Sequence, residues 1–148
     1  MTDNRVIKFR ALKDDMSNCN WVYGSLVISK DGIPRITEDG VLFHTCLKGT
    51  EGQFTGLHDK NGNEIYEGDI CKVFVDTGAI AEKKTGHMYG FVEWVKNKFI
   101  ISPFRYEGTI ERVFGKDKIY GFLPDEFYHI DQIEVIGNHY QNPELIKP

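Results

Sequence analysis

The sequence has few cysteines, and their spacing does not build a cross-linked or metal-bound fold. Cys19, Cys46 and Cys71 are an odd number, and no two of them form a C-x-x-C pair. A disulfide framework needs an even set, and a zinc site needs closely spaced Cys or His ligands. We therefore expect reduced thiols, no metal and no cofactor, as is typical of a cytoplasmic protein.

Long apolar runs are also missing. No stretch approaches the ~18 consecutive apolar residues of a membrane-spanning helix. The first ten residues, MTDNRVIKFR, lack the apolar segment of a secretory signal. The sequence therefore predicts a soluble cytoplasmic protein with no membrane partner.

Catalytic motifs are absent where they are usually sought. The sequence contains no G-x-S-x-G, G-x-G-x-x-G or H-E-x-x-H segment. Residues 108–116 fail as a phosphate-binding loop because the spacing is too long and Asp117 stands where Ser or Thr is required. We assign no catalytic and no metal-binding residue, and we expect a protein that is not an enzyme.

The composition is that of a folded protein. Of the 148 residues, 41% are hydrophobic, 13% aromatic and 27% charged, which argues against disorder. The length permits one domain of ordinary size or two small ones, each able to bury a core.

The charge balance disfavours nucleic acid as a partner. The chain has 18 basic and 22 acidic residues, and its net charge is −4. Residues 1–56 contain seven of each sign, so the acidic excess lies in the remainder. Since Lys and Arg supply most of the affinity for phosphates, nucleic-acid binding is unlikely. An accessory factor for nucleic acid stays an alternative, and its candidate contacts are Lys83, Lys84, Lys96, Lys98 and Arg105.

Two turn signals lie close together near the middle of the chain. Asp59, Asn61 and Gly62 are typical of a hairpin, because Asp accepts a local backbone hydrogen bond and Asn-Gly tolerates positive φ. Gly68 and Asp69 indicate a second turn, with Gly68 at positive φ. We interpret these five residues as structural. The strand that follows should carry Cys71, Val73 and Val75 on one face and Ile70, Lys72 and Phe74 on the other.

Apolar alternation predicts further strands along the chain. We expect them at 6–12, 21–29, 33–37, 41–47, 88–95, 98–104, 109–114, 118–122 and 133–136. Pro34 makes 33–37 an edge strand, because proline cannot donate to a ladder. Residues 76–86 resemble a surface loop, 124–126 a helix start and 142–144 a terminal turn. Gly49 to Gly52 is the predicted linker between regions 1–52 and 53–148.

Several strings also resemble one family. QFTGLHDKNGNEIYEGDICKV at 53–73 is similar to the signature of the YopX-like family of bacteriophages and prophages, and IKFRAL, WVYGSLV and IEVIGNHYQNPEL extend the resemblance over most of the chain. The resemblance implies a mainly β protein of a bacterial host cell. It implies a small N-terminal β-rich region followed by an SH3-like barrel domain, and it implies no biochemical activity.

The aromatic residues suggest a binding surface. Our candidates for binding are Tyr89, Trp94, Phe104, Tyr106 and Tyr128, because aromatic side chains are enriched at interfaces. Strands too few to close a sheet would leave edges and apolar faces to be covered. We therefore expect a non-enzymatic binding or assembly module that acts as a homo-oligomer, with an unknown phage or host protein as a further partner.

One enzymatic alternative remains. His129 lies one helical turn after Asp125 and two residues before Asp131, so a carboxylate could orient its imidazole as a general base. This pattern predicts an acid-base or metal-assisted enzyme centred on His129.

Overall fold

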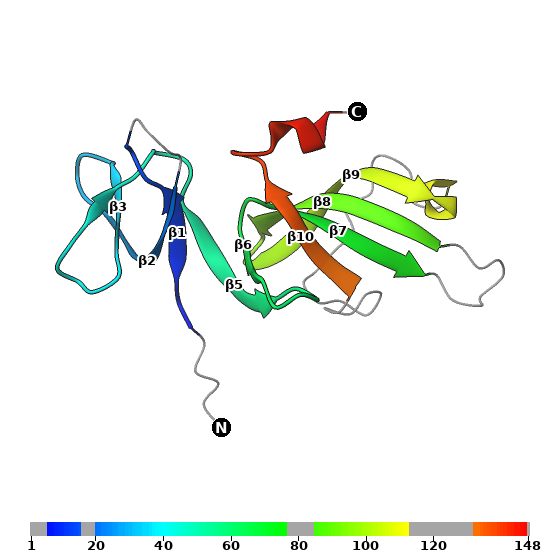
Figure 1. The fold of residues 1–148 in the computed structure, drawn as a ribbon, viewed down its shortest axis with the longest axis horizontal. Coiled ribbons are helices and arrows are strands. Elements are labelled where there is room, and N and C mark those ends of the chain that lie inside the picture. Colours follow the sequence, from blue (N-terminus) through cyan, green and yellow to red (C-terminus); the bar gives the residue numbers. More distant parts are fainter. Residues whose placement is uncertain (1–5, 16–19, 77–84, 113–131, 148) are drawn as a thin grey trace, which may run out of the picture. The chain divides into compact units, whose positions relative to one another are not determined.

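The protein is mainly β and divides into two compact units. The computed structural model describes residues 6–15, 20–76, 85–112 and 132–147 (Figure 1). Unit 1 is Met1–Gly56 and unit 2 is Leu57–Pro148. The described residues form antiparallel strands and short 3-10 turns, with no α-helix among them.

Unit 1 is built on an antiparallel sheet around a small core. Its strands are β1 (Phe9–Leu12), β2 (Trp21–Ile28), β3 (Pro34–Thr37), β4 (His44–Thr45) and β5 (Gly52–His58). They lie in the order β4-β3-β2-β1-β5. The core consists of Ala11, Ile36 and Cys46, with Phe9, Val22 and Leu26 packed against it.

The prediction of an edge strand at 33–37 is wrong, because β3 lies between β2 and β4. Pro34 is the first residue of β3 and is paired with Ile28, a position where a missing donor is tolerated. Its carbonyl accepts a hydrogen bond from the Cys46 N–H at 2.9 Å. The short strand β4 takes the edge position in its place.

The predicted linker, residues 49–52, overlaps a hydrogen-bonded turn over 47–50 that leads into β5. Thr50 is buried, and its Oγ1 accepts a bond from the Leu12 N–H at 3.0 Å and donates one to the Leu47 carbonyl at 2.7 Å. Gly52 already belongs to β5 and is paired with Arg10. The division between the units lies four residues beyond the expected one, inside β5.

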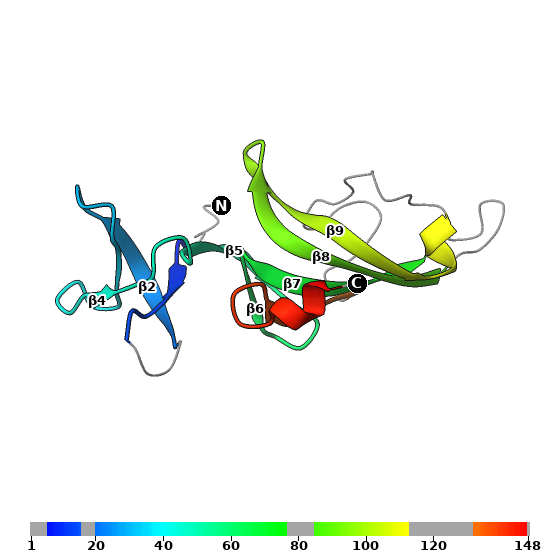
Figure 2. The same cartoon turned by 90° about the horizontal axis from the view of Figure 1, so that it is seen from above.

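Unit 2 contains a second antiparallel sheet, with the strand order β10-β7-β8-β9 (Figure 2). The elements of unit 2 are β6 (Glu64–Tyr66), β7 (Asp69–Asp76), β8 (Thr85–Val95), β9 (Lys98–Gly108), η1 (Thr109–Arg112), β10 (Ile133–Asn138) and η3 (Pro143–Ile146). Of these, β6 is the neighbour of β5 and does not belong to the second sheet. The strand predicted over 109–114 is therefore wrong where the structure describes it, since Thr109–Arg112 is a 3-10 turn. The expected strand at 118–122 and helix start at 124–126 lie outside the described residues.

The β8–β9 hairpin follows from its turn residues. Lys96 and Asn97 have φ values of 48° and 66°, the left-handed pair that a two-residue turn between twisted strands requires. The predicted hairpin is confirmed, and each strand is longer than expected.

The predicted alternation in β7 is also confirmed. Cys71, Val73 and Val75 are buried in the core of unit 2, whereas Lys72 is half-buried and Phe74 is exposed. The core is completed by Ile65, Met88, Val92, Ile101, Ile110 and Ile133. The described strands form an open sheet, and no closed barrel is seen among them.

The side chain of Asp59 holds the β5–β6 turn together through hydrogen bonds within the turn. Its Oδ1 accepts bonds from the backbone N–H groups of Asn61 and Asn63, each at 2.9 Å. Gly62, with a φ of 83°, donates its N–H to the Asp59 carbonyl at 3.0 Å. The segment is therefore a turn built on one buried carboxylate.

The same carboxylate fastens the turn to β10. The Asp59 Oδ2 accepts a bond from the Val135 N–H at 2.9 Å, 76 residues away. The Lys60 N–H donates to the Ile133 carbonyl at 3.0 Å, and the Lys60 Nζ lies 2.9 Å from a Glu134 carboxylate oxygen. The turn thus satisfies backbone groups along β10 that β7 does not pair.

Replacing Asp59 should destabilise the protein in a pH-dependent way. Burial acts to raise the pKa of Asp59, but hydrogen bonds from the N–H groups of Val135, Asn63 and Asn61 outweigh it and hold the pKa below its usual 3.8. We expect Asp59→Ala to lower the free energy of unfolding at pH 7 by about 2–3 kcal/mol, since bonds to a charged acceptor are lost. Urea denaturation measures this.

A lowered pKa stabilises the folded state above pH 3.8, and that stability is lost as the pH falls through the lower folded value. The difference between Asp59→Ala and the wild type should therefore be constant above pH 3.8 and should shrink below it. Asp59→Asn, which does not ionise, should fall between the two at pH 7. A difference unchanged down to pH 2 would contradict the role of the charge.

Gly68→Ala should destabilise more than Gly62→Ala. Both glycines have positive φ, 90° and 83°, so alanine is strained at either. A Cβ at Gly68 would also lie 3.3 Å from the Tyr140 ring, whereas a Cβ at Gly62 meets nothing within 4 Å. We expect a loss of about 1 kcal/mol or more for Gly68→Ala. Equal denaturation midpoints for the two variants would show that the Tyr140 contact is immaterial.

Candidate functional site

The face of the unit 2 sheet opposite the core carries aromatic and charged side chains. We call them the outer face: Lys72 and Phe74 on β7, His87, Tyr89 and Phe91 on β8, and Phe104, Arg105 and Glu107 on β9. They alternate with the core residues, except that Phe104 is the extra residue of a bulge in β9 beside Arg105. The register aligns Glu134, Lys72, Tyr89 and Arg105 in one row across four strands.

Tyr89 is the centre of this row. The Arg105 guanidinium lies 4.0 Å from its ring centroid and the Lys72 ammonium 6.0 Å, both within the range of a cation–π contact. The Tyr89 hydroxyl donates to a Glu107 carboxylate oxygen at 2.9 Å. Tyr89 as a whole is only 7% exposed, because the neighbouring charged side chains cover it.

Beside the row lies an aromatic group that joins two segments distant in sequence. The rings of Phe91 and Phe104 are 4.8 Å apart, and His139 packs edge-on against Phe91 at 5.9 Å. The Tyr140 ring lies 3.8 Å from His139. The group holds the residues after β10 against the sheet.

The structure places the predicted binding residues at different sites. Tyr89 and Phe104 lie on the outer face, whereas Tyr106 packs against the core of unit 2. Trp94 lies near the β8–β9 turn, exposed, with its ring edge-on to Phe99 at 4.7 Å. Tyr128 lies outside the described residues.

The enzymatic alternative is not brought together within the described part of the chain, because His129, Asp125 and Asp131 lie outside it. In the described ranges, no three His, Cys, Asp or Glu side chains gather where they could hold a metal ion.

Cys46 is buried, and this burial raises the pKa of its thiol. Among the described residues, no helix has the length and apolar character to cross a membrane.

The described basic residues give little support to nucleic-acid binding, because they are far apart or lie beside acidic side chains. Lys96 lies in the β8–β9 turn and Lys98 directly follows it, and Arg105 lies seven residues along β9 from Lys98, roughly 24 Å away at the rise of a strand. Lys83 and Lys84 lie outside the described residues. Lys72 and Arg105 lie beside two acidic side chains, Glu107 and Glu134, so these four charges cancel.

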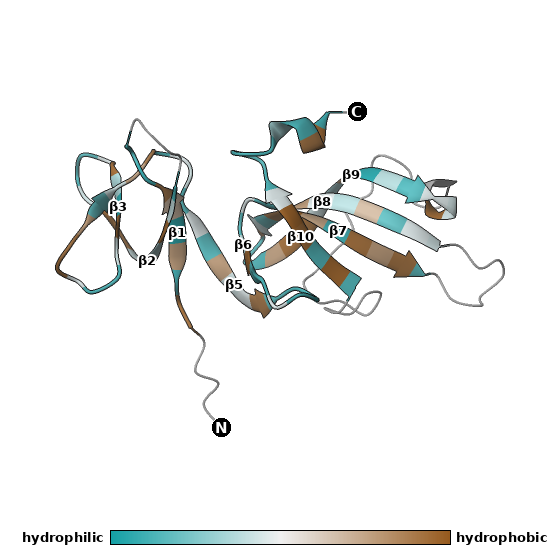
Figure 3. Cartoon of the chain, in the orientation of Figure 1, coloured by the Kyte–Doolittle hydropathy of each residue, from teal (hydrophilic) through white to brown (hydrophobic). Residues whose placement is uncertain are grey.

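Three consecutive large apolar side chains are exposed in unit 1, on the loop between β3 and β4. Val41 is 77% exposed, Leu42 68% and Phe43 47%. We call these three residues the apolar loop, and Figure 3 shows this loop in brown beyond the sheet. Three consecutive large apolar residues in water indicate a contact surface.

A polar network holds the apolar loop in place. The Asp39 Oδ1 accepts bonds from the N–H groups of Val41 at 2.8 Å and Leu42 at 2.9 Å. The Gly40 N–H donates to the Thr37 Oγ1 at 2.8 Å. The bonds from Leu42 and Val41 hold the pKa of Asp39 below its usual value, so the carboxylate stays charged at neutral pH. The loop is therefore preorganised with its side chains outward.

Sequence reasoning missed this loop. The apolar residues 41–47 predict one strand, but only His44–Thr45 forms a strand, with Cys46 in an isolated bridge to Lys13. The missed signal is Asp39-Gly40, a dipeptide typical of turns, where Gly40 takes a φ of 78°.

Comparison with known proteins identifies a family for this chain. The family model of the YopX protein matches residues 8–147, nearly the whole chain. The chain belongs to the YopX family.

A solved structure is also similar to this YopX-family chain. The crystal structure of protein EF1440 from Enterococcus faecalis is 22% identical to it and covers 96% of this chain and 99% of the other. The TM-score is 0.47. No curated protein matches the chain.

The protein should bind DNA negligibly at physiological salt. The charges of the outer face nearly cancel, so few phosphates could be neutralised together. Titration of a fluorescent duplex at about 150 mM salt measures this. A micromolar dissociation constant that falls steeply as the salt is lowered would contradict it.

Proposed function

We propose that this YopX-family protein is a non-enzymatic binding and assembly module that associates with copies of itself through the apolar loop. One observation carries the proposal: Val41, Leu42 and Phe43 are consecutive, exposed and held outward by a hydrogen-bonded turn. Exposure of these apolar side chains to water is unfavourable in free energy, and their burial in an interface would be favourable.

The energetics predict a weak association. Fully burying one large apolar side chain contributes about 1.5–3 kcal/mol. Association costs about 4–15 kcal/mol in lost freedom, before side chains are ordered. Three such side chains contribute about 4.5–9 kcal/mol, which is comparable with that cost, so the net free energy of association is small. The dissociation constant should be on the order of micromolar or weaker.

The turn at Asp39 lowers the cost of binding. A loop that is already ordered loses little conformational freedom when it docks, and this saving appears as affinity. Because the side chains of Asp39 and Thr37 bond to neighbouring residues of the same turn, the turn needs no partner to form.

The finer features of fold and setting are part of the same proposal. The meander β7-β8-β9, with β10 returning beside β7, supports an SH3-like arrangement of unit 2. The family match supports a phage- or prophage-type protein, which we place in the cytoplasm of the bacterial host. A phage or host protein is a second partner that the same loop could bind.

Light scattering tests the association. We expect the average mass of the wild type to rise above 17.0 kDa with concentration. Leu42→Ser should shift this rise to about tenfold higher concentration, because part of the apolar contact is lost. Ile7→Ser is the matched control, since Ile7 is also 68% exposed but lies outside the loop.

Circular dichroism should show the two variants to be as folded as the wild type. A wild-type mass of 17.0 kDa at every accessible concentration would overturn the proposal. If Leu42→Ser and Ile7→Ser weakened association equally, the apolar loop would not be the surface that mediates it.

A further inference from the structure

The strands β2, β3 and β4 of unit 1 have an apolar surface at each end. One end is the apolar loop. The other lies around the β2–β3 loop and the residues after β4, where three large apolar side chains and two lysines are exposed. We call this second surface the basic end: Ile28, Lys30, Ile33, Leu47 and Lys48.

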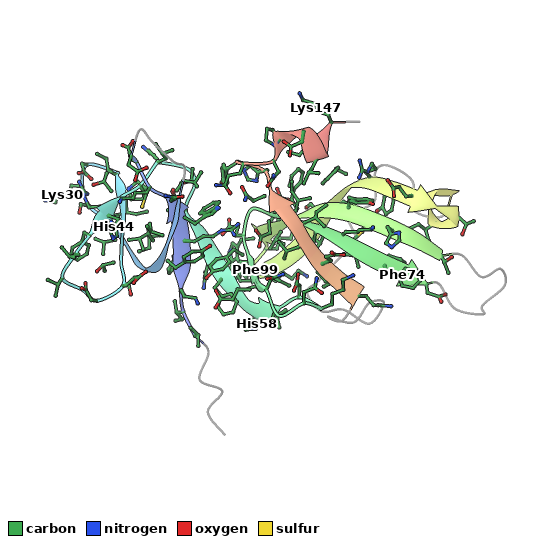
Figure 4. The ribbon with its side chains drawn as sticks, viewed as in Figure 1. Lys30, His44, His58, Phe74, Phe99 and Lys147 are labelled. Atoms are coloured by element: carbon green, nitrogen blue, oxygen red, sulfur yellow. The ribbon has the colours of Figure 1, made fainter. Side chains whose placement is uncertain are left out.

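The register shows that these surfaces lie at opposite ends of the meander. Thr37, which precedes the apolar loop, is paired with Ser25, whereas Pro34 at the start of β3 is paired with Ile28. The Cys46 N–H bonds to the Pro34 carbonyl and brings Leu47 to the same end. Figures 1 and 4 show the two loops apart, with Lys30 labelled on one of them.

The two lysines of the basic end keep their charge available. Asp31 is already paired with Arg35 at 2.8 Å, and the Glu51 carboxylate accepts the Gly49 N–H at 2.8 Å. Within the described residues, neither Lys30 nor Lys48 forms an ion pair.

The apolar loop has the opposite charge beside it. Glu38 and Asp39 precede Val41 directly, and both are exposed. Each surface is therefore an exposed apolar patch next to two like charges, acidic at one end and basic at the other. Complementary potentials of this kind set which surfaces meet.

We propose that the apolar loop of one copy docks on the basic end of another copy, head to tail. This rests on the proposed function and adds the surface that receives the loop. A loop-to-loop contact around a twofold axis would instead place Glu38 and Asp39 of both copies together, and like charges oppose it. A head-to-tail contact leaves one surface free on each end copy, so the assembly grows into a ring or an open chain.

Two variants, each disabling one surface, test the contact. Leu42→Asp places a charge in the apolar loop, and Lys30→Glu combined with Lys48→Glu reverses the charge of the basic end. Each variant alone should associate about tenfold or more weakly than the wild type, because both ends of the contact are needed. Mixed at equal concentration, they should form a particle of about twice 17.0 kDa, since each retains the surface that the other lacks.

The outcomes separate this inference from the proposed function. Wild-type monomers at all concentrations would overturn both. If Leu42→Asp abolishes association while the reversed basic end associates as the wild type does, the loop-mediated association stands and the head-to-tail contact is wrong. A mixture that never exceeds the masses of its components would overturn it as well. Leu47→Ser, an uncharged change at the basic end, replaces the double variant if thermal melting shows that variant to be unfolded.

Discussion

The carboxylate of Asp59 is the interaction on which unit 2 depends. Its two oxygens accept backbone N–H groups from the turn that carries it and from Val135 on β10. An edge strand such as β10 would otherwise present unpaired groups to water or to another chain. One ionised side chain therefore closes a hairpin and covers the edge of a sheet.

Unit 1 uses the same chemistry to a different end. Asp39, like Asp59, organises a turn by accepting N–H groups from the residues that follow it. The turn at Asp59 lies against β10, whereas the turn at Asp39 presents Val41, Leu42 and Phe43 to solvent. The difference lies in what surrounds each turn, because the local hydrogen bonds are alike. A stable turn with an uncovered apolar tip is suited to recognition.

The outer face of unit 2 differs from the apolar loop in being internally satisfied. Tyr89 is covered by Arg105 and Lys72, and its hydroxyl is bonded to Glu107. Such contacts stabilise a sheet across its strands. They leave little exposed apolar area that a partner could bury. The apolar loop is therefore the better candidate for a binding surface.

The sequence by itself determined the features that depend on neighbouring residues. Alternation in β7, the positive φ of Gly68 and the β8–β9 hairpin follow from side-chain period and turn chemistry, and the structure agrees with each. Tertiary structure alone decided the bond between Asp59 and Val135, the interior place of β3 and the exposure of Val41 to Phe43. Strand pairing and burial depend on segments far apart in the chain. The sequence shows that a residue is apolar, but it does not show whether other segments bury that residue or leave it exposed to water.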